Sequence, residues 1–249
     1  MIKRLIAGAI CCFMVPMISM ATVTVQQSII KGEKHFLTGY KTHNLDGTVN
    51  VVIEIPAGTT AKYEVDHKSG QMALEQKNGY PRYVQYIGYP GNYGMIPRTI
   101  QAKELGGDGD PLDAIVLGDP ADRGSVIKAR PIGVLKLTDH GEEDSKIIMV
   151  AVGSPFERIH SIKDLDVKFP GISKIIEIWF TYYKGYDQKG NIPMKSLGIA
   201  DRSEAIRMIG ESALLFEQGQ VRESDLPKLD ENGNPRILFH PNARNIAGN

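Results

Sequence analysis

The sequence predicts an α+β fold that is mainly β, with strands in the first half of the chain and helices in the second. The strand-like segments are rich in β-branched and aromatic residues and are bounded by Gly, Pro, Asp or Asn. They span residues 48–56, 61–66, 82–90, 113–118, 125–139 and 145–153. Short strands at such close spacing are typical of a barrel or a sandwich. With 249 residues, 42% of them apolar, the chain is long enough for one large domain or two small ones.

Two amphipathic helices are predicted in the second half. The first has Pro170 in its first turn and ends near Gly185. Its expected buried face consists of Ile172, Ile175, Ile176, Trp179 and Tyr183. The second begins at an N-cap, Ser203. Its expected buried face consists of Ile206, Ile209, Ala213 and Phe216. The Pro- and Gly-containing tail predicts an extended C-terminal arm from about residue 219.

The N-terminus has the pattern of a signal peptide. Lys3 and Arg4 precede an apolar stretch at 5–20, and a small-x-small pattern ends at Ala21. We therefore expect export to the periplasm or the medium after cleavage near Ala21, with residues 22–249 as a single domain. An uncleaved anchor is the alternative, although the stretch is shorter than the roughly 20 residues of a spanning helix. Both cysteines lie within residues 1–21, so we expect no disulfide in the mature chain.

The charge balance argues against a nucleic-acid-binding function. The 29 Lys and Arg residues equal the 29 Asp and Glu residues in number. A nucleic-acid-binding domain shows a strong basic excess, so a nucleic-acid-binding OB fold is disfavoured. No other apolar run is long enough to span a membrane, so no span is expected after processing.

Aspartates gather around one apolar segment in "GGDGDPLDAIVLGDP", residues 106–120. Asp108 and Asp110 also suit a plain turn, but Asp113 sits directly on a strand that must be buried. The spacing fails for an EF-hand, because Leu112 occupies the fifth position counted from Asp108. Zinc is disfavoured because the six histidines show no ligand spacing. Oxygen ligands alone favour a hard cation, with Mg²⁺ the best match and calcium and manganese behind it.

Further charged residues stand beside the other predicted strands. Asp139, Asp144 and Lys146 lie where two neighbouring strands end and begin, although the sequence between them also fits a solvated hairpin turn. Glu54 lies inside an apolar strand, where a carboxylate is costly unless it is paired or bound to metal. Strand alternation places Lys62 and Glu64 on one face, which could equally be an ordinary exposed face.

Basic and tyrosine side chains complete a candidate phosphate pocket. They are Arg82, Tyr89, Tyr93, Tyr183 and Lys184. Lys, Arg and Tyr beside a metal cluster provide the donors that phosphate oxygens need. For Tyr183, simple packing in the core is the alternative.

These motifs together resemble the soluble family I inorganic pyrophosphatases. The resemblance begins with "DGDPLDAIVL" and extends, in family order, to "VVIEIPAGTTAKYEVD", "GYPGNYGMIPRT", "GSVIKARPIGVLKLTD", "EEDSKIIMVAV" and "YYKGYD". It covers residues 51–187. It implies a distorted five-stranded OB-like closed barrel flanked by helices.

The resemblance also implies an activity. This is Mg²⁺-dependent hydrolysis of inorganic diphosphate to two phosphates, by in-line attack of a metal-activated water. Several Mg²⁺ ions per site are implied, with Mn²⁺ or Zn²⁺ as substitutes and Ca²⁺ inhibitory. A homo-oligomer is expected.

Residue roles are carried over by position. Asp110 is implied to help deprotonate the attacking water. The implied metal ligands are Asp108, Asp113, Asp139, Asp144, Glu54 and Glu64. The implied substrate-binding residues are Lys62, Arg82, Tyr93, Lys146, Tyr183 and Lys184, with Tyr89 supporting them.

Three features depart from the compact bacterial forms of the family. They are the extra residues before Arg82, the long tail and the expected export. Two alternative functions remain open at this point. One is an exported cation- or phosphate-binding protein on the same scaffold, and the other is a hydrolase of longer polyphosphates.

Overall fold

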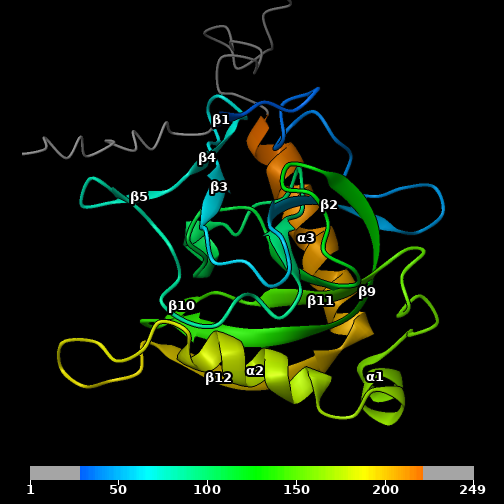
Figure 1. Cartoon of the computed structure of the whole chain (residues 1–249). Coiled ribbons are helices and arrows are strands. Elements are labelled where there is room, and N and C mark those ends of the chain that lie inside the picture. The colour runs from blue at the N-terminus through cyan, green and yellow to red at the C-terminus, as the bar shows by residue number, and fades with distance from the viewer. Residues whose placement is uncertain (1–28, 221–249) are drawn as a thin grey trace, which may run out of the picture.

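A computed structural model describes residues 29–220 and shows a ring of five strands at its centre (Figure 1). In ring order the strands are β2 (Val49–Ile55), β7 (Asn92–Met95), β8 (Asp113–Leu117), β11 (Lys146–Ala151) and β9 (Val126–Asp139). Pairing of β9 with β2 closes the ring. The β8–β11 pair is parallel and the other pairs are antiparallel. The mainly-β fold and the five-stranded closed barrel are therefore confirmed.

The remaining strands are short, apart from β12. They are β1 (Ile29–Ile30), β3 (Tyr63–Val65), β4 (Met72–Leu74), β5 (Gln76–Lys77), β6 (Tyr80–Pro81), β10 (Glu142–Glu143) and β12 (Met194–Asp201). Strands β1, β4 and β3 form a small sheet, β5 and β6 form a separate hairpin, and β10 and β12 extend the main sheet from β9. The long β9 thus joins the barrel to the helical layer.

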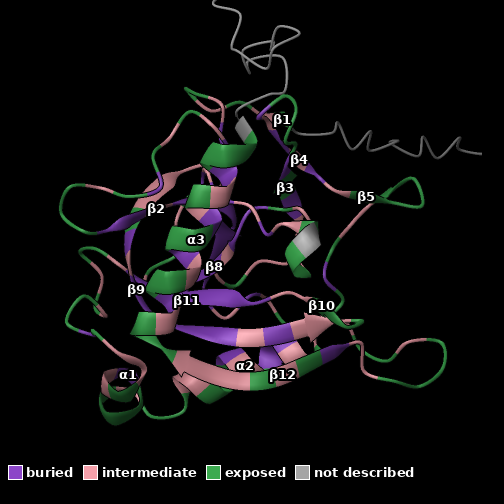
Figure 2. Ribbon diagram, turned by 180° about the vertical axis from the view of Figure 1, so that it is seen from behind, coloured by how far each residue is buried: buried purple, intermediate pink, exposed green. Residues whose placement is uncertain are grey.

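Three helices flank the barrel: α1 (Ile162–Lys168), α2 (Ile172–Tyr182) and α3 (Arg202–Gln220). In Figure 1, α2 lies in front of β12 and α3 runs along the barrel beside β9, in agreement with the residues in contact. In Figure 2 the buried residues concentrate in β8, β9 and β11, while the outer face of α3 is exposed. No helix in the stretch 29–220 has the length and apolarity needed to cross a membrane.

The buried face of α2 agrees with the predicted one at Ile176 and Trp179 and differs from it at Ile175. Ile176, Trp179 and Phe180 are buried, whereas Ile175 is 55% exposed. The indole of Trp179 fixes this rotation, because it packs 4.3 Å from the ring of Tyr89 and donates a hydrogen bond to the carbonyl of Ile87. Helical spacing alone could not choose between the neighbouring faces that Ile175 and Phe180 define.

The start of α3 was predicted incorrectly, and its buried face was predicted correctly at Ile209 and Phe216 but not at Ile206. Asp201, rather than Ser203, is the cap, because its Oδ1 accepts hydrogen bonds from the backbone N–H groups of Ser203 and Glu204. Ile206 is 44% exposed. The buried residues on the inner side are Ala205, Ile209, Ser212 and Phe216. The helix continues to Gln220, past the predicted start of the arm. The rest of that arm and the predicted signal peptide lie outside the described residues.

Most predicted strands are confirmed, and one is wrong. Residues 48–56, 113–118, 125–139 and 145–153 contain β2, β8, β9 and β11, and residues 61–66 contain the shorter β3. Residues 82–90 form only an isolated bridge at Tyr83 and bends. This segment follows the loop at 57–62 irregularly, and Gly88 approaches the backbone of Gly58 too closely for a side chain. Helix α1 and strand β12 were not predicted.

A close backbone approach in the barrel gives a stability prediction. A Cβ added at Gly94 would overlap the carbonyl oxygen of Val52 on the paired strand. We expect Gly94→Ala to lower the free energy of unfolding by about 2–3 kcal/mol, because backbone must move to admit the methyl group. The control is Gly210→Ala on the exposed side of α3, where no atom obstructs the methyl group. It should raise stability by roughly 0.5–1 kcal/mol. Urea unfolding measures both, and equal midpoints for the two variants would contradict this account.

Candidate active site

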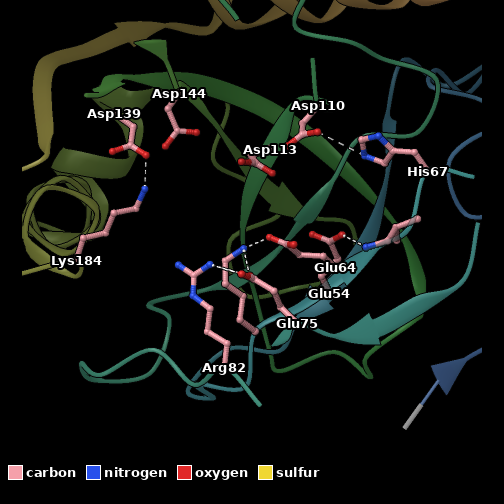
Figure 3. A network of polar contacts seen from close by, with 12 residues as sticks. Glu54, Glu64, His67, Glu75, Arg82, Asp110, Asp113, Asp139, Asp144 and Lys184 are labelled. Carbon is pink, nitrogen blue, oxygen red and sulfur yellow. Dashed lines mark hydrogen bonds and ion pairs between the residues drawn. The ribbon is translucent and has the colours of Figure 1, made fainter. Parts of the chain in front are cut away.

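An open cavity of about 310 Å³ brings the predicted site residues together. All of them line it except Tyr89. Nine carboxylates face four Lys and Arg side chains there, so the lining carries a negative excess. The acids are Glu54, Glu64, Asp108, Asp110, Asp113, Asp139, Glu142, Glu143 and Asp144, and the bases are Lys62, Arg82, Lys146 and Lys184. Figure 3 shows the acids converging from the barrel strands and the neighbouring loops.

The parallel pair β8–β11 places Asp113 beside Lys146. These are the first residues of their strands and are partners in register. The Lys146 ammonium donates to Asp113 Oδ2 at 2.6 Å and also contacts Asp144, and its side chain is only 2% exposed. Burial acts to lower the pKa of Lys146, but the charges and hydrogen bonds of the two aspartates outweigh it and raise the pKa. Lys146 is therefore a fixed, buried cation in the wall of the cavity.

The loop that carries Asp108 and Asp110 is held by its own backbone. The Asp110 N–H donates to Asp108 Oδ1 at 2.9 Å, and Gln101 exchanges backbone hydrogen bonds with Asp110 and Gly109. Gly109 has φ +90°, and a Cβ at Gly107 would overlap the backbone of Gln101. The glycines in "GGDGDP" are thus needed for a tight turn that points two carboxylates into one cavity.

Glu54 is the most deeply buried acid of the site. Its residue is 5% exposed, and its Oε1 accepts a hydrogen bond from the backbone N–H of Val65 at 3.0 Å. Burial and the charge of Asp113 raise the pKa of Glu54 to about 8, against the opposing effect of Lys62. Burial also raises the pKa values of Asp108 and Asp144. The nearby lysines do not fully offset the burial of these carboxylates, and a divalent cation would stabilise their ionised forms.

Asp139 and Lys184 meet where β9 ends and the chain leaves α2. The Lys184 ammonium donates to Asp139 Oδ2 at 2.5 Å (Figure 3). The other oxygen, Asp139 Oδ1, is buried and has no hydrogen-bond partner among the described residues. An unpartnered buried carboxylate oxygen is costly, so a further positive partner would stabilise it.

Aromatic residues support the cavity from behind. Tyr89 lies 5.0 Å from Tyr93 and 4.3 Å from Trp179 between ring centroids, and Trp179 stacks on Tyr183 at 4.7 Å. Burial raises the pKa values of the three tyrosines, so their hydroxyls stay protonated hydrogen-bond donors. Tyr93 and Tyr183 reach the cavity, while Tyr89 packs behind them.

Comparison with known proteins assigns this chain to a protein family. The family model described as inorganic pyrophosphatase matches residues 51–217. The inorganic pyrophosphatase of Gluconobacter oxydans is 42% identical over 174 residues, which are 68% of this chain and 91% of that protein. The chain belongs to the family I inorganic pyrophosphatases. Its activity is therefore the hydrolysis of inorganic diphosphate.

Solved structures agree with this assignment. The inorganic pyrophosphatase of Helicobacter pylori superimposes with a TM-score of 0.60 and 30% identity, covering 72% of this chain and 98% of that one. The enzyme of Thermus thermophilus gives a TM-score of 0.61 and 29% identity, covering 73% and 99%. The fold of this pyrophosphatase is thus shared over nearly the whole length of both bacterial structures.

Sequence reasoning missed several residues of the site. His67, Glu142 and Glu143 line the cavity, and His67 Nε2 lies 3.7 Å from Asp110 Oδ1. Glu142 and Glu143 stand in "HGEED", the stretch between the strands that also fits a solvated hairpin turn. Glu75 lies outside the lining but contacts Arg82 and Lys62. No spacing or composition signal distinguishes Glu75 from an ordinary surface residue.

The donor set of the pyrophosphatase fits hard cations, although the ligands are not gathered around one point. Within 29–220, no three Asp, Glu, His or Cys side chains are close enough together to hold a metal ion as they stand. Lysines contact the acids instead: Lys62 contacts Glu64, Lys146 contacts Asp113 and Asp144, and Lys184 contacts Asp139. The excess of carboxylates and the unpartnered Asp139 oxygen favour a hard cation such as Mg²⁺.

The raised pKa of Glu54 predicts a pH-dependent stability. The folded state binds this proton more tightly than the unfolded state, so stability is lost as pH rises from about 4.5 to about 8. In EDTA, we expect the unfolding free energy of Glu54→Gln to fall less over this pH range than that of the wild type, by on the order of 2–4 kcal/mol. Urea unfolding at pH 5 and pH 8.5 measures it. The control is Glu211→Gln, at an exposed position on α3. It should lose as much unfolding free energy between pH 5 and pH 8.5 as the wild type does. If Glu54→Gln showed the same pH dependence of the unfolding free energy as the wild type, Glu54 would be ionised in the folded protein.

Proposed function

We propose that inorganic diphosphate binds in the 310 Å³ cavity, with its phosphates on the basic and tyrosine side chains. The observation that carries this proposal is the lining itself, where four Lys and Arg side chains share one open cavity with nine carboxylates. Bases and protonated tyrosine hydroxyls donate to phosphate oxygens. The phosphate-binding set is Lys62, Arg82, Tyr93, Lys146, Tyr183 and Lys184.

We propose that the carboxylates hold Mg²⁺. The ligands are Asp108, Asp113, Asp139, Asp144, Glu54 and Glu64, which could accommodate several ions. When bound, Mg²⁺ neutralises phosphate charge and lowers the pKa of water. Mn²⁺ or Zn²⁺ would substitute, whereas the larger Ca²⁺ would inhibit because it coordinates more flexibly.

The chain's own residues orient the substrate and receive the proton. Lys146 is fixed by its two aspartates and offers a buried positive charge to the phosphate it faces. Asp110 lines the cavity with a 64% exposed side chain, and in this proposal it accepts the proton of the attacking water. The described lining contains no Ser, Thr or Cys side chain, which favours direct attack by water over a covalent step at those side chains.

The metal assignment predicts the ion dependence of phosphate release. Purified protein should release phosphate from diphosphate rapidly with Mg²⁺, and release should stop with EDTA. Ca²⁺ should support less than about a tenth of the Mg²⁺ rate, because its geometry is poorly defined. Equal rates with Ca²⁺ and Mg²⁺ would contradict the choice of metal. A folded protein that binds diphosphate and releases none would support the binding-protein alternative.

The proton acceptor predicts the effect of one isosteric change. Asp110→Asn should lower kcat by at least about 100-fold, because the amide cannot accept the proton. The fold should be retained, since the side chain is largely exposed. Stopped assays of phosphate release measure kcat, and urea unfolding checks the fold. The matched control is Asp119→Asn, an exposed position just beyond β8 and outside the cavity, which should keep the wild-type kcat. A wild-type kcat in Asp110→Asn would refute the role of this residue.

We further propose that residues 1–21 direct export, that residues 22–249 form one domain, and that the enzyme is a homo-oligomer. The n-region, apolar run and small-x-small pattern support export. Exposed Ile175, Ile178 and Tyr182 on the outer face of α2 support self-association. N-terminal sequencing of the native protein, calorimetric unfolding and sedimentation test the three statements in turn. An intact Met1, two separate transitions or a monomer would refute them respectively.

A further inference from the structure

We propose that Glu75 is a positioning residue for diphosphate hydrolysis, which holds Lys62 and Arg82 as a pair at the rim of the cavity. The inference rests on the proposed phosphate-binding role of these two residues. Glu75 does not line the cavity itself. It acts from behind, through the two cations that do.

The Glu75 carboxylate contacts both cations. Arg82 Nη1 donates to Oε1 at 2.6 Å and to Oε2 at 2.7 Å, and Lys62 Nζ lies 3.3 Å from Oε2 (Figure 3). The three side chains are only 13–27% exposed. Hydrogen bonds between charged groups in such partly shielded positions are stronger than those at the open surface.

The backbones of the same three residues form a closed triangle of hydrogen bonds. The Lys62 N–H donates to the Arg82 carbonyl at 3.0 Å, Arg82 N–H to Glu75 at 2.8 Å, and Glu75 N–H to Lys62 at 2.9 Å. Each residue therefore donates to one partner and accepts from the other. This triangle fixes the origin of the three side chains, and the carboxylate then fixes the ends of the two cationic ones.

The hairpin β5–β6 explains why Arg82 needs this support. The hairpin separates Glu75 from Arg82 in sequence and turns at Asn78 (φ 56°) and Gly79 (φ 80°). It projects from the body of the protein in Figure 1, and within 29–220 its strands pair only with each other. Tyr80 on it is 75% exposed. Arg82 is thus delivered to the cavity by a poorly packed element, and Glu75 supplies the anchorage that the hairpin lacks.

The charge arrangement leaves Arg82 able to bind phosphate. Arg82 contacts Glu75 through Nη1 alone, and its Nε and Nη2 make no hydrogen bond to any other described residue. Burial acts to raise the pKa of Glu75, but hydrogen bonds from Arg82 and the charges of Lys62 and Arg82 lower it, so the carboxylate is ionised at neutral pH. It offsets the mutual repulsion of the two cations while leaving donors free on the guanidinium.

The first experiment separates binding from turnover. Glu75→Gln keeps the shape and removes the charge. We expect the KM for Mg²⁺-diphosphate to rise about 10-fold or more, while kcat changes less than about 3-fold, because phosphate orientation is weakened and the proton acceptor is untouched. Glu75→Asp keeps the charge and should lie closer to wild type, and it carries the test if Glu75→Gln does not fold. The control Glu217→Gln breaks an Arg98–Glu217 pair of the same length outside the cavity and should change neither constant.

A double-mutant cycle distinguishes action through Arg82 from a general loss of structure. If Glu75 acts through Arg82, Glu75→Gln should raise KM much less in an Arg82→Ala background than in wild type. Fully additive effects would overturn the positioning role. A raised KM in Arg82→Ala with wild-type KM in Glu75→Gln would overturn it as well. An unchanged KM in Arg82→Ala would instead overturn the phosphate-binding role on which the inference rests.

Discussion

The structure of the site depends on one buried ionic contact, that of Lys146 with Asp113 and Asp144. The parallel register of β8 and β11 sets the first two residues side by side, and the strands on either side are closed into a ring. A lysine with a 2% exposed side chain is tolerated only because two carboxylates hold it charged. Removing Lys146 would leave two neighbouring carboxylates without their shared cation in the wall of the barrel.

Lysines contact carboxylates around the rest of the cavity as well. Nine carboxylates in one cavity repel each other, and the lysines reduce that repulsion by contacting the acids in small groups. The contacts are incomplete, as the raised pKa of Glu54 and the unpartnered oxygen of Asp139 show. The residual negative charge is what favours divalent cations.

The sequence was informative where a single strand determines the position of a residue. Asp113 and Glu54 could be predicted because a carboxylate on an apolar strand needs a reason to be there. The sequence was uninformative where tertiary contacts determine the backbone conformation or the buried face of a helix. Residues 82–90 have strand composition, yet they follow an irregular loop; the face of α2 is chosen by Trp179 against Tyr89. Glu75 is recognisable only after the hairpin has brought Arg82 back beside it, 7 positions along the chain.

The cavity therefore has two kinds of wall. One wall consists of strand residues of the barrel, the buried Glu54, Tyr93 and Lys146 and the partly buried Asp113, which are held by the ladder and by each other. The other consists of residues on connections: the aspartate loop at 106–110, Arg82 after the hairpin, and Lys184 after α2. Catalysis of phosphoryl transfer relies on positioning and charge. The barrel wall supplies fixed charge, so precision at the second wall must come from local clamps. Gln101, which exchanges backbone hydrogen bonds with the aspartate loop, and Glu75, which contacts Arg82, are such clamps, and neither lines the cavity.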